Sequence, residues 1–406
     1  MKTSPLLGCL AVCALACSTS ELDRAGAVSE PIVGGEPADN PAIVLIAGHG
    51  VCSGALVAPN LVLTARHCVS AVTGGGFECD EQGHVIPSQY VGAGTFGATN
   101  AADGYVIEHV GGSPSGAAVA QILVAPATTL CEADMAMMVL DGPVDDPVCA
   151  PLRLDATPAV GEHLTSLGWG MTEGTSYATV LQQRAVTVTV VGPAPMDGVG
   201  GSGGGPASAV PPGFLMTTEG ACHGDSGSPA LAASGAAVGV LSFINRTDAS
   251  PAPGTAADCV GARAVYQSLH AERDFILAGF ASAEATPWLE GSPDPRGALA
   301  EFGSTCTRDA DCKSNVCLPG ADGIARCSQG CVETPCPQGY HCIDASGRMR
   351  CTQDAPAPAP AEEPSSSGCA VASSPPTGWW LPWLLAAPAA ALAARRRTAR
   401  RWCVGR

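Results

Sequence analysis

The distribution of cysteine constrains this chain more than any other feature of its sequence. Eight of its 20 cysteines fall within residues 306–351, and few large apolar residues lie between them. A segment this short cannot bury an ordinary hydrophobic core, and covalent cross-links must therefore hold it together. Disulfide cross-links in turn indicate that the protein folds in an oxidising compartment. The eight are Cys306, Cys312, Cys317, Cys327, Cys331, Cys336, Cys342 and Cys351.

Zinc binding is the alternative explanation for a cysteine-rich segment. None of the spacings between the eight cysteines is the paired C-x2-C of structural zinc modules. We therefore expect a disulfide-rich module over residues 301–352, with no bound metal and no other cofactor. So many cysteines allow many pairings, and the sequence does not choose among them.

Upstream of this module, residues 32–265 consist of short apolar runs broken by Gly, Pro and Asn. The runs at 60–65, 136–142 and 185–192 end in turn-forming residues and predict strands. The first helical periodicity lies in residues 264–280, with apolar side chains at Val265, Leu269, Phe275, Ile276 and Phe280. The pattern predicts an all-β region that ends in one helix.

The chain is strongly acidic, with a formal net charge of −17. Six of its 20 basic residues are arginines in the last twelve positions, so the rest of the chain has no basic surface suited to nucleic acid. We expect no nucleic-acid partner, and we interpret the acidity as solubility in an extracellular medium.

Both ends of the chain have targeting features. Residues 1–17 combine one lysine, an apolar centre and small residues, which is typical of an export signal peptide. "ALAC" at 14–17 also resembles a bacterial lipoprotein box, so lipidation of Cys17 and ordinary signal cleavage both stay open.

Near the other end, a Pro/Ala/Ser spacer at 353–368 precedes the segment 369–406. Residues 378–394 form an apolar run without a polar face, with tryptophans at one end and arginines at the other. This pattern predicts a transmembrane anchor that contacts the membrane. With Cys369 after a glycine, the tail resembles the sorting tags of myxobacterial surface proteins. The resemblance implies retention at the cell surface or outer membrane, or release by processing near the cysteine.

Three side chains predict nucleophilic catalysis. Ser226 lies in "ACHGDSGSPA" (221–230), His67 in "LTARHC", and Asp134 opens the strand-like "DMAMMVL". Each residue alone is explained as well by a structural role, as a turn serine, an ordinary histidine or a strand-start cap. In the order His–Asp–Ser, each at the edge of a predicted strand, they supply the base, the orienting carboxylate and the nucleophile of acyl transfer.

Residues 32–280 resemble the chymotrypsin/trypsin family of serine endopeptidases. The resemblance implies two six-stranded antiparallel β-barrels with a C-terminal helix, in a protease domain at 32–285, followed by a linker at 286–300. Arg66 and Ser228 stand where the family usually has Ala and Gly. The matching segments occur in family order: "IVGG" (32–35), "CSGALVAPNLVLTARHC" (52–68), "DMAMMVL" (134–140), "LGWG" (167–170), "CHGDSGSP" (222–229) and "LSF" (241–243).

The resemblance implies a role for each matching residue. Ser226 attacks the scissile carbonyl of a protein or peptide substrate, His67 transfers its proton, and Asp134 orients the histidine. Backbone N–H groups of Gly224 and Ser226 form the oxyanion hole, and Ser242 supports Asp134 by a hydrogen bond.

Activation is a further implication. In the family a new amino-terminus, here Ile32, pairs with the aspartate beside the nucleophile, here Asp225, after removal of a propeptide at 18–31. Pro31 stands where relatives have Arg or Lys. Either another protease cuts after Pro31, or the cut falls elsewhere and is trimmed. The alternative function is a surface binding or adhesion protein whose protease domain stays a zymogen and whose cysteine-rich module holds an unknown ligand.

The resemblance also places the substrate pocket. Gly220 falls at its floor and carries no countercharge for a basic side chain, while Ile244 and Ala264 fall at its walls. A branched Ile244 predicts a shallow pocket for small or medium apolar residues. Glu219, if it turned inward, would instead favour basic residues.

Cysteines of the protease domain fit the family pattern. Two disulfides are implied, Cys52–Cys68 and Cys222–Cys259. Cys149 resembles the position that ties to a propeptide cysteine, here Cys17, if Cys17 is not lipidated. Otherwise the remaining pair is Cys79–Cys131.

Overall fold

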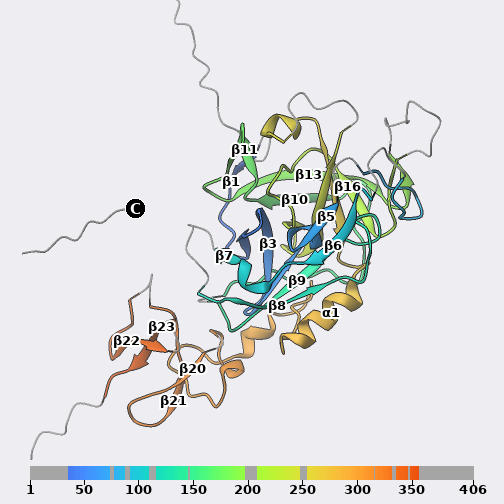
Figure 1. Ribbon diagram of the computed structural model, residues 1–406. Helices are drawn as coiled ribbons and strands as arrows, with labels where there is room; N and C mark the ends of the chain where they lie inside the picture. The colour runs from blue at the N-terminus through green and yellow to red at the C-terminus, as the bar shows by residue number, and fades with distance from the viewer. Residues whose placement is uncertain are drawn as a thin grey trace, which may run out of the picture. The chain divides into compact units, whose positions relative to one another are not determined.

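A computed structural model of the protein describes residues 35–73, 77–86, 92–108, 116–144, 147–196, 208–246, 254–314, 316–331, 335–345 and 348–355. Two large antiparallel sheets dominate these residues (Figure 1). The strands predicted at 60–65, 136–142 and 185–192 are confirmed as β4 (Leu61–Thr64), β9 (Ala136–Leu140) and part of β13 (Gln182–Val191).

The first sheet curls but stays open. Its strand order is β7-β2-β3-β4-β9-β8, and among the described residues its two outer strands do not pair with each other. The three residues of β7 offer few hydrogen bonds for closure. The strands not yet defined are β2 (Ile43–Ala47), β3 (Val51–Ala58), β7 (Val106–Glu108) and β8 (Val119–Val124).

The second sheet closes into a barrel, because β13 pairs with both β10 and β16. Its order is β1-β13-β10-β17-β18-β19-β16, so six strands form the ring and β1 lies outside it. The expectation of two closed six-stranded barrels is therefore correct for this sheet and wrong for the first. Its other strands are β1 (Glu36–Pro37), β10 (His163–Gly168), β16 (Phe214–Thr217), β17 (Pro229–Leu231), β18 (Ala237–Asn245) and β19 (Arg263–Ser268).

The helical periodicity at 264–280 is only half right. Residues Arg263–Ser268 form β19, because they pair with β18 on one side and β16 on the other. The helix α1 (Arg273–Ser282) begins after them and packs against β9, with Ile276 and Phe280 buried (Figure 1). Two-sided sheet pairing outweighs an approximate helical period.

Short hairpins and single turns of 3-10 helix complete the described fold. The hairpins are β5 (Ser70–Thr73) with β6 (Thr95–Thr99), β11 (Met171–Glu173) with β12 (Ser176–Tyr177), and β14 (Ala194–Pro195) with β15 (Ala209–Val210). The 3-10 turns are η1 (Arg66–Cys68), η2 (Ala102–Gly104), η3 (Ala256–Asp258), η4 (Pro295–Ala298) and η5 (Asp309–Asp311).

The segment expected as a linker, 286–300, is hydrogen-bonded to the body that the two large sheets form. Leu152 N donates to Trp288 O at 2.8 Å, and Glu290 N donates to Leu152 O at 2.9 Å. Arg153 Nη2 also donates to Glu290 Oε1 at 2.9 Å. These contacts hold the segment along the body.

The cysteine-rich module is a tandem repeat of one four-cysteine unit. In each unit the first cysteine bonds the third, 11 residues away, and the second bonds the fourth, 15 residues away. Each unit has one hairpin, and its third and fourth cysteines face each other across the strands. The hairpins are β20 (Cys317–Pro319) with β21 (Ala325–Cys327), and β22 (Tyr340–Ala345) with β23 (Arg348–Gln353).

No helix in the described ranges is long and apolar enough to cross a membrane. The predicted span at 378–394, the signal, the propeptide and residues 356–368 of the spacer lie outside the described residues, whereas Gln353, the first residue of the predicted spacer, ends β23. The domain boundaries given above stay predictions.

Candidate active site

His67 and Asp134 meet at the end of two neighbouring strands. His67 lies in η1 directly after β4, and Asp134 lies just before β9, which pairs with β4. The His67 backbone N–H donates to Asp134 Oδ1 at 2.9 Å, and His67 Nδ1 lies 2.7 Å from Asp134 Oδ2. These two hydrogen bonds to one carboxylate fix the orientation of the His67 imidazole and leave its Nε2 available to a third group.

The Asp134 carboxylate is fully buried and is held by the second sheet as well. Ser242 Oγ, in β18, donates to Asp134 Oδ2 at 2.5 Å, and the Asp134 backbone N–H donates to Gln267 Oε1, in β19, at 3.2 Å. The site therefore lies where the two sheets meet. Burial by itself lowers the pKa of His67, but its ion pair and hydrogen bond with Asp134 outweigh this effect and raise that pKa above 6.5.

Ser226 lies in a turn that packs against the first sheet. Its carbonyl accepts a hydrogen bond from Ser53 N at 2.8 Å. Gly227 has a φ of +85°, and a Cβ there would lie 2.1 Å from Thr64 Oγ1, so only glycine allows this approach. Ser226 and His67 line the same cavity of about 290 Å³. The two described side chains share the cavity without a hydrogen bond to each other.

Two backbone donors lie beside this serine. The Gly224 carbonyl is held by Ser53 Oγ at 3.0 Å. Within the described part of the chain, the N–H groups of Gly224 and Ser226 donate to no acceptor. Backbone donors left free next to a nucleophile are what an oxyanion hole requires.

Asp225 is fully buried behind the same turn. Its Oδ1 accepts from Gly170 N at 2.6 Å, and its Oδ2 accepts from Cys222 N at 2.8 Å. Burial raises the pKa of Asp225 to about 7, and the two backbone N–H groups only partly offset this. Among the described residues it has no cationic partner. Ile32 lies outside them, so the Ile32–Asp225 pair stays a prediction.

The cavity wall contains one of the three predicted pocket residues. Ile244 lines it, whereas Ala264 is buried behind as the cross-strand partner of Ile244. Gly220 does not line it: a Cβ at Gly220 would lie 2.3 Å from Val186 Cγ1, so this residue is packed against β13.

Glu219 does not turn into the cavity. Its Oε1 accepts from Arg184 Nη1 at 3.0 Å, and its Oε2 accepts from Gly261 N at 2.9 Å. The basic-residue specificity that an inward Glu219 would give therefore loses its support.

Other residues of the cavity wall were not singled out from the sequence. They are Val72, Phe77, Leu130, His223, Leu241 and Phe243, of which His223, Leu241 and Phe243 lie in matching motifs. His223 Nε2 lies 2.9 Å from Asp258 Oδ2. Phe77 comes from the segment between β5 and β6, which no motif marks. Only the fold brings it to the cleft.

Arg66 has a structural explanation. Its guanidinium donates to the carbonyls of Ala125 and Ala127, at 2.8 and 2.5 Å, and lies 4.2 Å from the ring centre of Phe96. Arg66 thus ties η1, and with it His67, to the segment before Asp134.

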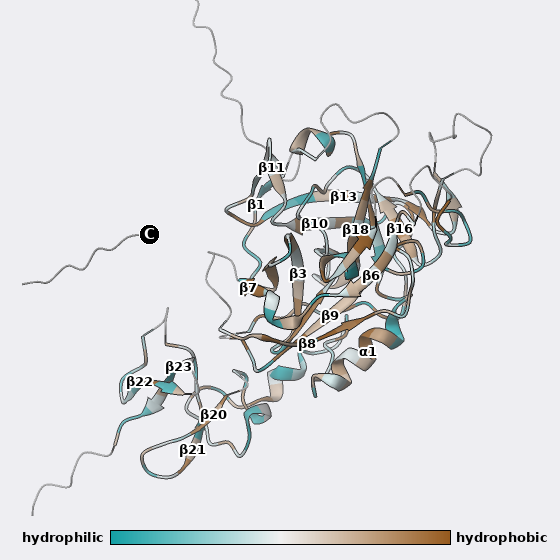
Figure 2. Ribbon diagram, viewed as in Figure 1, coloured by the Kyte–Doolittle hydropathy of each residue, from teal (hydrophilic) through white to brown (hydrophobic). Residues whose placement is uncertain are grey.

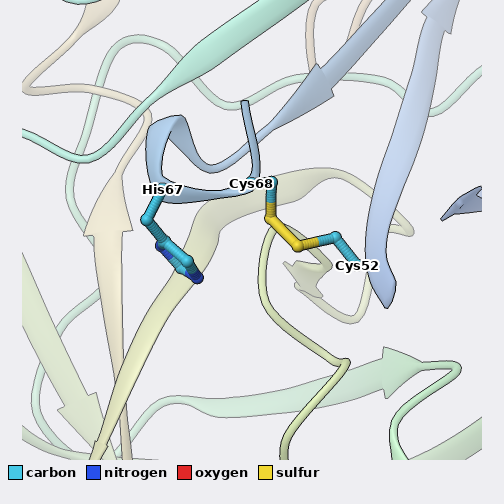
Figure 3. Close-up of side chains that lie close together, drawn as sticks. All are labelled: Cys52, His67 and Cys68. Atoms are coloured by element: carbon cyan, nitrogen blue, oxygen red, sulfur yellow. A yellow bond between two sulfur atoms is a disulfide. The ribbon is translucent and has the colours of Figure 1, made fainter. Parts of the chain in front are cut away.

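Three disulfides join segments of the chain that surround the candidate site. The implied pairs Cys52–Cys68 and Cys222–Cys259 are both formed, each with an S–S distance of 2.05 Å, and Cys79–Cys131 is formed as well. Figure 3 shows the Cys52–Cys68 bond next to the His67 ring. These sulfurs lie within 4.8 Å of a His67 nitrogen, but disulfide sulfurs are not the thiolates that bind metals.

Cys149 is the free cysteine of the described residues, and it is buried. Burial raises the pKa of the Cys149 thiol to about 12, and the positive charge of Arg296 offsets only part of this rise. Its predicted alternative partner, Cys17, lies outside the described residues.

The two sheets, with a buried aspartate bonded to a histidine and a turn serine between them, define the architecture of a serine-protease fold. The family model described as Trypsin matches residues 32–261, more than half of the chain. The chain belongs to the trypsin family. No curated protein matches its sequence.

One solved structure with a similar chain is described as the atomic-resolution structure of HBP. It is 20% identical, and the match covers 63% of this chain and 99% of that chain, with a TM-score of 0.39. The family assignment rests on the family model.

Proposed function

We propose that this protein is a serine endopeptidase that cleaves peptide bonds through an acyl-enzyme at Ser226. The observation that carries the proposal is the hydrogen bond between buried Asp134 and His67 at a cavity that Ser226 also lines. The N–H groups of Gly224 and Ser226, without acceptors in the described chain, support it.

In the proposed reaction, Ser226 Oγ attacks the scissile carbonyl carbon while His67 Nε2 takes the hydroxyl proton. The backbone N–H groups stabilise the oxyanion that forms. His67 then gives the proton to the leaving amine as the C–N bond breaks, which leaves an ester on Ser226. Water, deprotonated by His67, hydrolyses the ester and restores the serine.

A fluorophosphonate probe tests the nucleophile. We expect it to label the mature protein, and we expect Ser226→Ala to abolish labelling while Ser228→Ala, at a buried serine two residues away, retains it. Labelling that survives Ser226→Ala would overturn the assignment. A folded mature protein that takes no label would favour the alternative, a surface binding protein held as a zymogen.

The pH profile tests the role of His67. Because the base must be neutral and its pKa is raised, we expect kcat/KM to fall as the pH drops through a value above 6.5. Asp134→Asn should lower kcat by about 10,000-fold by removing the carboxylate that orients the imidazole. A profile that is flat between pH 5 and pH 8 would contradict this role.

We propose specificity for small or medium apolar residues before the scissile bond. Three features support it: the branched Ile244 in the cavity wall, the lack of an acidic side chain among the described residues of that wall, and the engagement of Glu219 elsewhere. Ile244→Gly should raise kcat/KM for phenylalanine relative to alanine by about 10-fold or more. Val260→Ala, at an exposed position outside the cavity wall, is the control. Preferred cleavage after Arg or Lys would refute this specificity.

We also propose export and retention at the cell surface, supported by residues 1–17 and 369–406 of the sequence. Deleting 369–406 should move the protein from the cell fraction to the medium. If the truncated protein stays with the cells, the anchor is lipidated Cys17 instead.

A further inference from the structure

A second cavity adjoins the one that holds Ser226. Its volume is about 180 Å³, and it shares Phe77, Phe243 and Ile244 with the first cavity. The rings of Phe77 and Phe243 pack edge to face, with centres 5.2 Å apart, and form the partition. The rest of its wall consists of Glu78, Cys79, Met196, Ser208 and Asn245.

Two buried polar atoms in this wall have no hydrogen-bond partner among the described residues. They are Ser208 Oγ and Asn245 Oδ1, and Ser208 is only 1% exposed. An unpaired buried polar atom is costly, so native proteins rarely keep one without a use. The Asn245 amide oxygen only accepts hydrogen bonds, and the Ser208 hydroxyl accepts as well as donates, so one ligand group with several N–H donors can satisfy both atoms.

The third oxygen-bearing side chain, Glu78, adds negative charge. It is exposed, and it forms no ion pair with a basic side chain among the described residues. The Cys79–Cys131 disulfide and the bond from Ala209 N to Cys79 O, at 2.7 Å, fix its position beside Ser208. One carboxylate and two unpaired acceptors suit a cationic side chain with several N–H donors.

The geometry of β18 connects this cavity to the scissile bond. Beyond Val240, β18 pairs with β19 alone among the described strands, so residues 242–245 have one free edge on which an extended peptide can add as a strand. From Ser242 to Asn245 the strand advances about 10 Å, which is about three residues of an extended peptide.

We propose that this cavity binds a lysine or arginine side chain of the substrate, three or four residues before the scissile bond. The inference rests on the proposed peptidase function and adds a second determinant of specificity. The apolar residue next to the cut and the basic residue upstream would together select the substrate.

Matched peptides test the proposal on the mature full-length protein. Each peptide carries one cleavable apolar site, with lysine or its uncharged isostere norleucine three or four residues upstream. We expect lysine to raise kcat/KM by about 10-fold, and we expect the same ratio in binding measured by fluorescence anisotropy. Added salt should reduce the ratio, because the Glu78 carboxylate is exposed.

Variants locate the effect. Glu78→Gln and Ser208→Ala should each reduce the lysine preference several-fold and leave cleavage of the norleucine peptide unchanged, which also reports that the variant folds. Glu81→Gln removes the same charge from an exposed position of the same segment outside the cavity wall, and it should leave the preference intact.

The outcomes separate this inference from the proposed function. Cleavage of both peptides at equal rates overturns the inference and leaves the peptidase assignment standing; water molecules would then satisfy the unpaired atoms. Binding that favours lysine without cleavage of either peptide supports the cavity and overturns the peptidase assignment. A lysine preference that survives Glu78→Gln and Ser208→Ala together also overturns the inference.

Discussion

The protease-like body, which the two large sheets and α1 form, and the cysteine-rich module are stabilised in opposite ways. The body buries apolar side chains from both sheets and α1 in extended core clusters and has three disulfides in its described residues. In the described part of 301–355, the buried apolar side chains are all cysteines: Cys312, Cys327 and Cys351. Figure 2 shows the same contrast, with more brown on β8 and β18 than on β22 and β23.

The two regions therefore depend on different features of the sequence for their stability. The body fixes its fold by many weak apolar contacts, so a single disulfide there adds to an existing core. The module has no such core, and its two hairpins keep their register through four covalent bonds. Loss of a bond should therefore lower stability in the body and remove the fold in the module.

The largest expected effect is on the module. Replacing Cys312 and Cys327 by alanine should unfold residues 301–331, because only the Cys306–Cys317 disulfide then remains in that unit, and hydrogen exchange there should approach the rate of an unfolded chain. The matched change in the body, Cys79 and Cys131 to alanine, should leave the protection of β9 and α1 in place. Equal loss of protection from exchange in both variants would contradict the claim that the body and the module depend on disulfides to different degrees.

A core substitution should give the next largest effect. Phe280→Ala removes a ring that is 2% exposed between α1 and the first sheet, and it should lower the free energy of unfolding by about 3–5 kcal/mol. The control is Ile324→Ala in the module, where the side chain is 47% exposed, with an expected change within about 0.5 kcal/mol. Chemical denaturation followed by exchange in each region measures both.

The buried charge of the body should make its stability depend on pH. Asp225 titrates at 3.8 in an unfolded chain and at about 7 when folded, so the folded protein holds this proton more tightly. The stability from this group is fully present below about pH 4 and is lost as the pH rises through about 7. Asp225→Asn should remove this loss and make the uncleaved chain more stable above pH 7 by at most about 4 kcal/mol.

Denaturation of the uncleaved chain at several pH values measures the effect, and Asp322 in the module is its control. Asp322 is exposed, and the hydrogen bonds that it accepts from Arg326 and from Ile324 N lower its pKa to about 2. Asp322→Asn should leave the profile between pH 4 and pH 7 unchanged. An Asp225→Asn chain with the wild-type profile would show that the carboxyl already has a cationic partner.

The smallest expected effect comes from an exposed ion pair of the module. Lys313 Nζ donates to Glu301 Oε1, and the side chains are 40% and 72% exposed. Lys313→Gln should shift the thermal midpoint by less than about 2 °C, because exposed pairs contribute little. A larger shift would mean that the module depends on charge as well as on disulfides.

Motif-bearing residues were predictable one by one. His67, Asp134 and Ser226 come together at one site, and Ser242 bonds Asp134 as expected, because each lies at a fixed offset from a strand that the sequence marks. The disulfides at Cys52 and Cys222 follow from the same motifs. The position of each of these residues relative to its strand is fixed locally, so pairing of the neighbouring strands brings the residues together.

Residues set by long-range packing were not predictable. Nothing near Phe77 or Ser208 in the sequence marks them as neighbours of the cleft, and Gly220 packs against Val186 instead of lining the cavity. Residues Arg263–Ser268 have a partly helical pattern and form a strand because two other strands flank them.

By itself, the sequence determined the β-rich class, the order of the motifs and the need for cross-links in residues 306–351. The tertiary structure decided which sheet closes, which cysteines of the module bond and which side chains surround Ser226. The physical reason is distance along the chain. A motif or a composition acts over a few residues, whereas sheet closure, disulfide pairing and cavity walls depend on which distant segments lie close together once the core has formed.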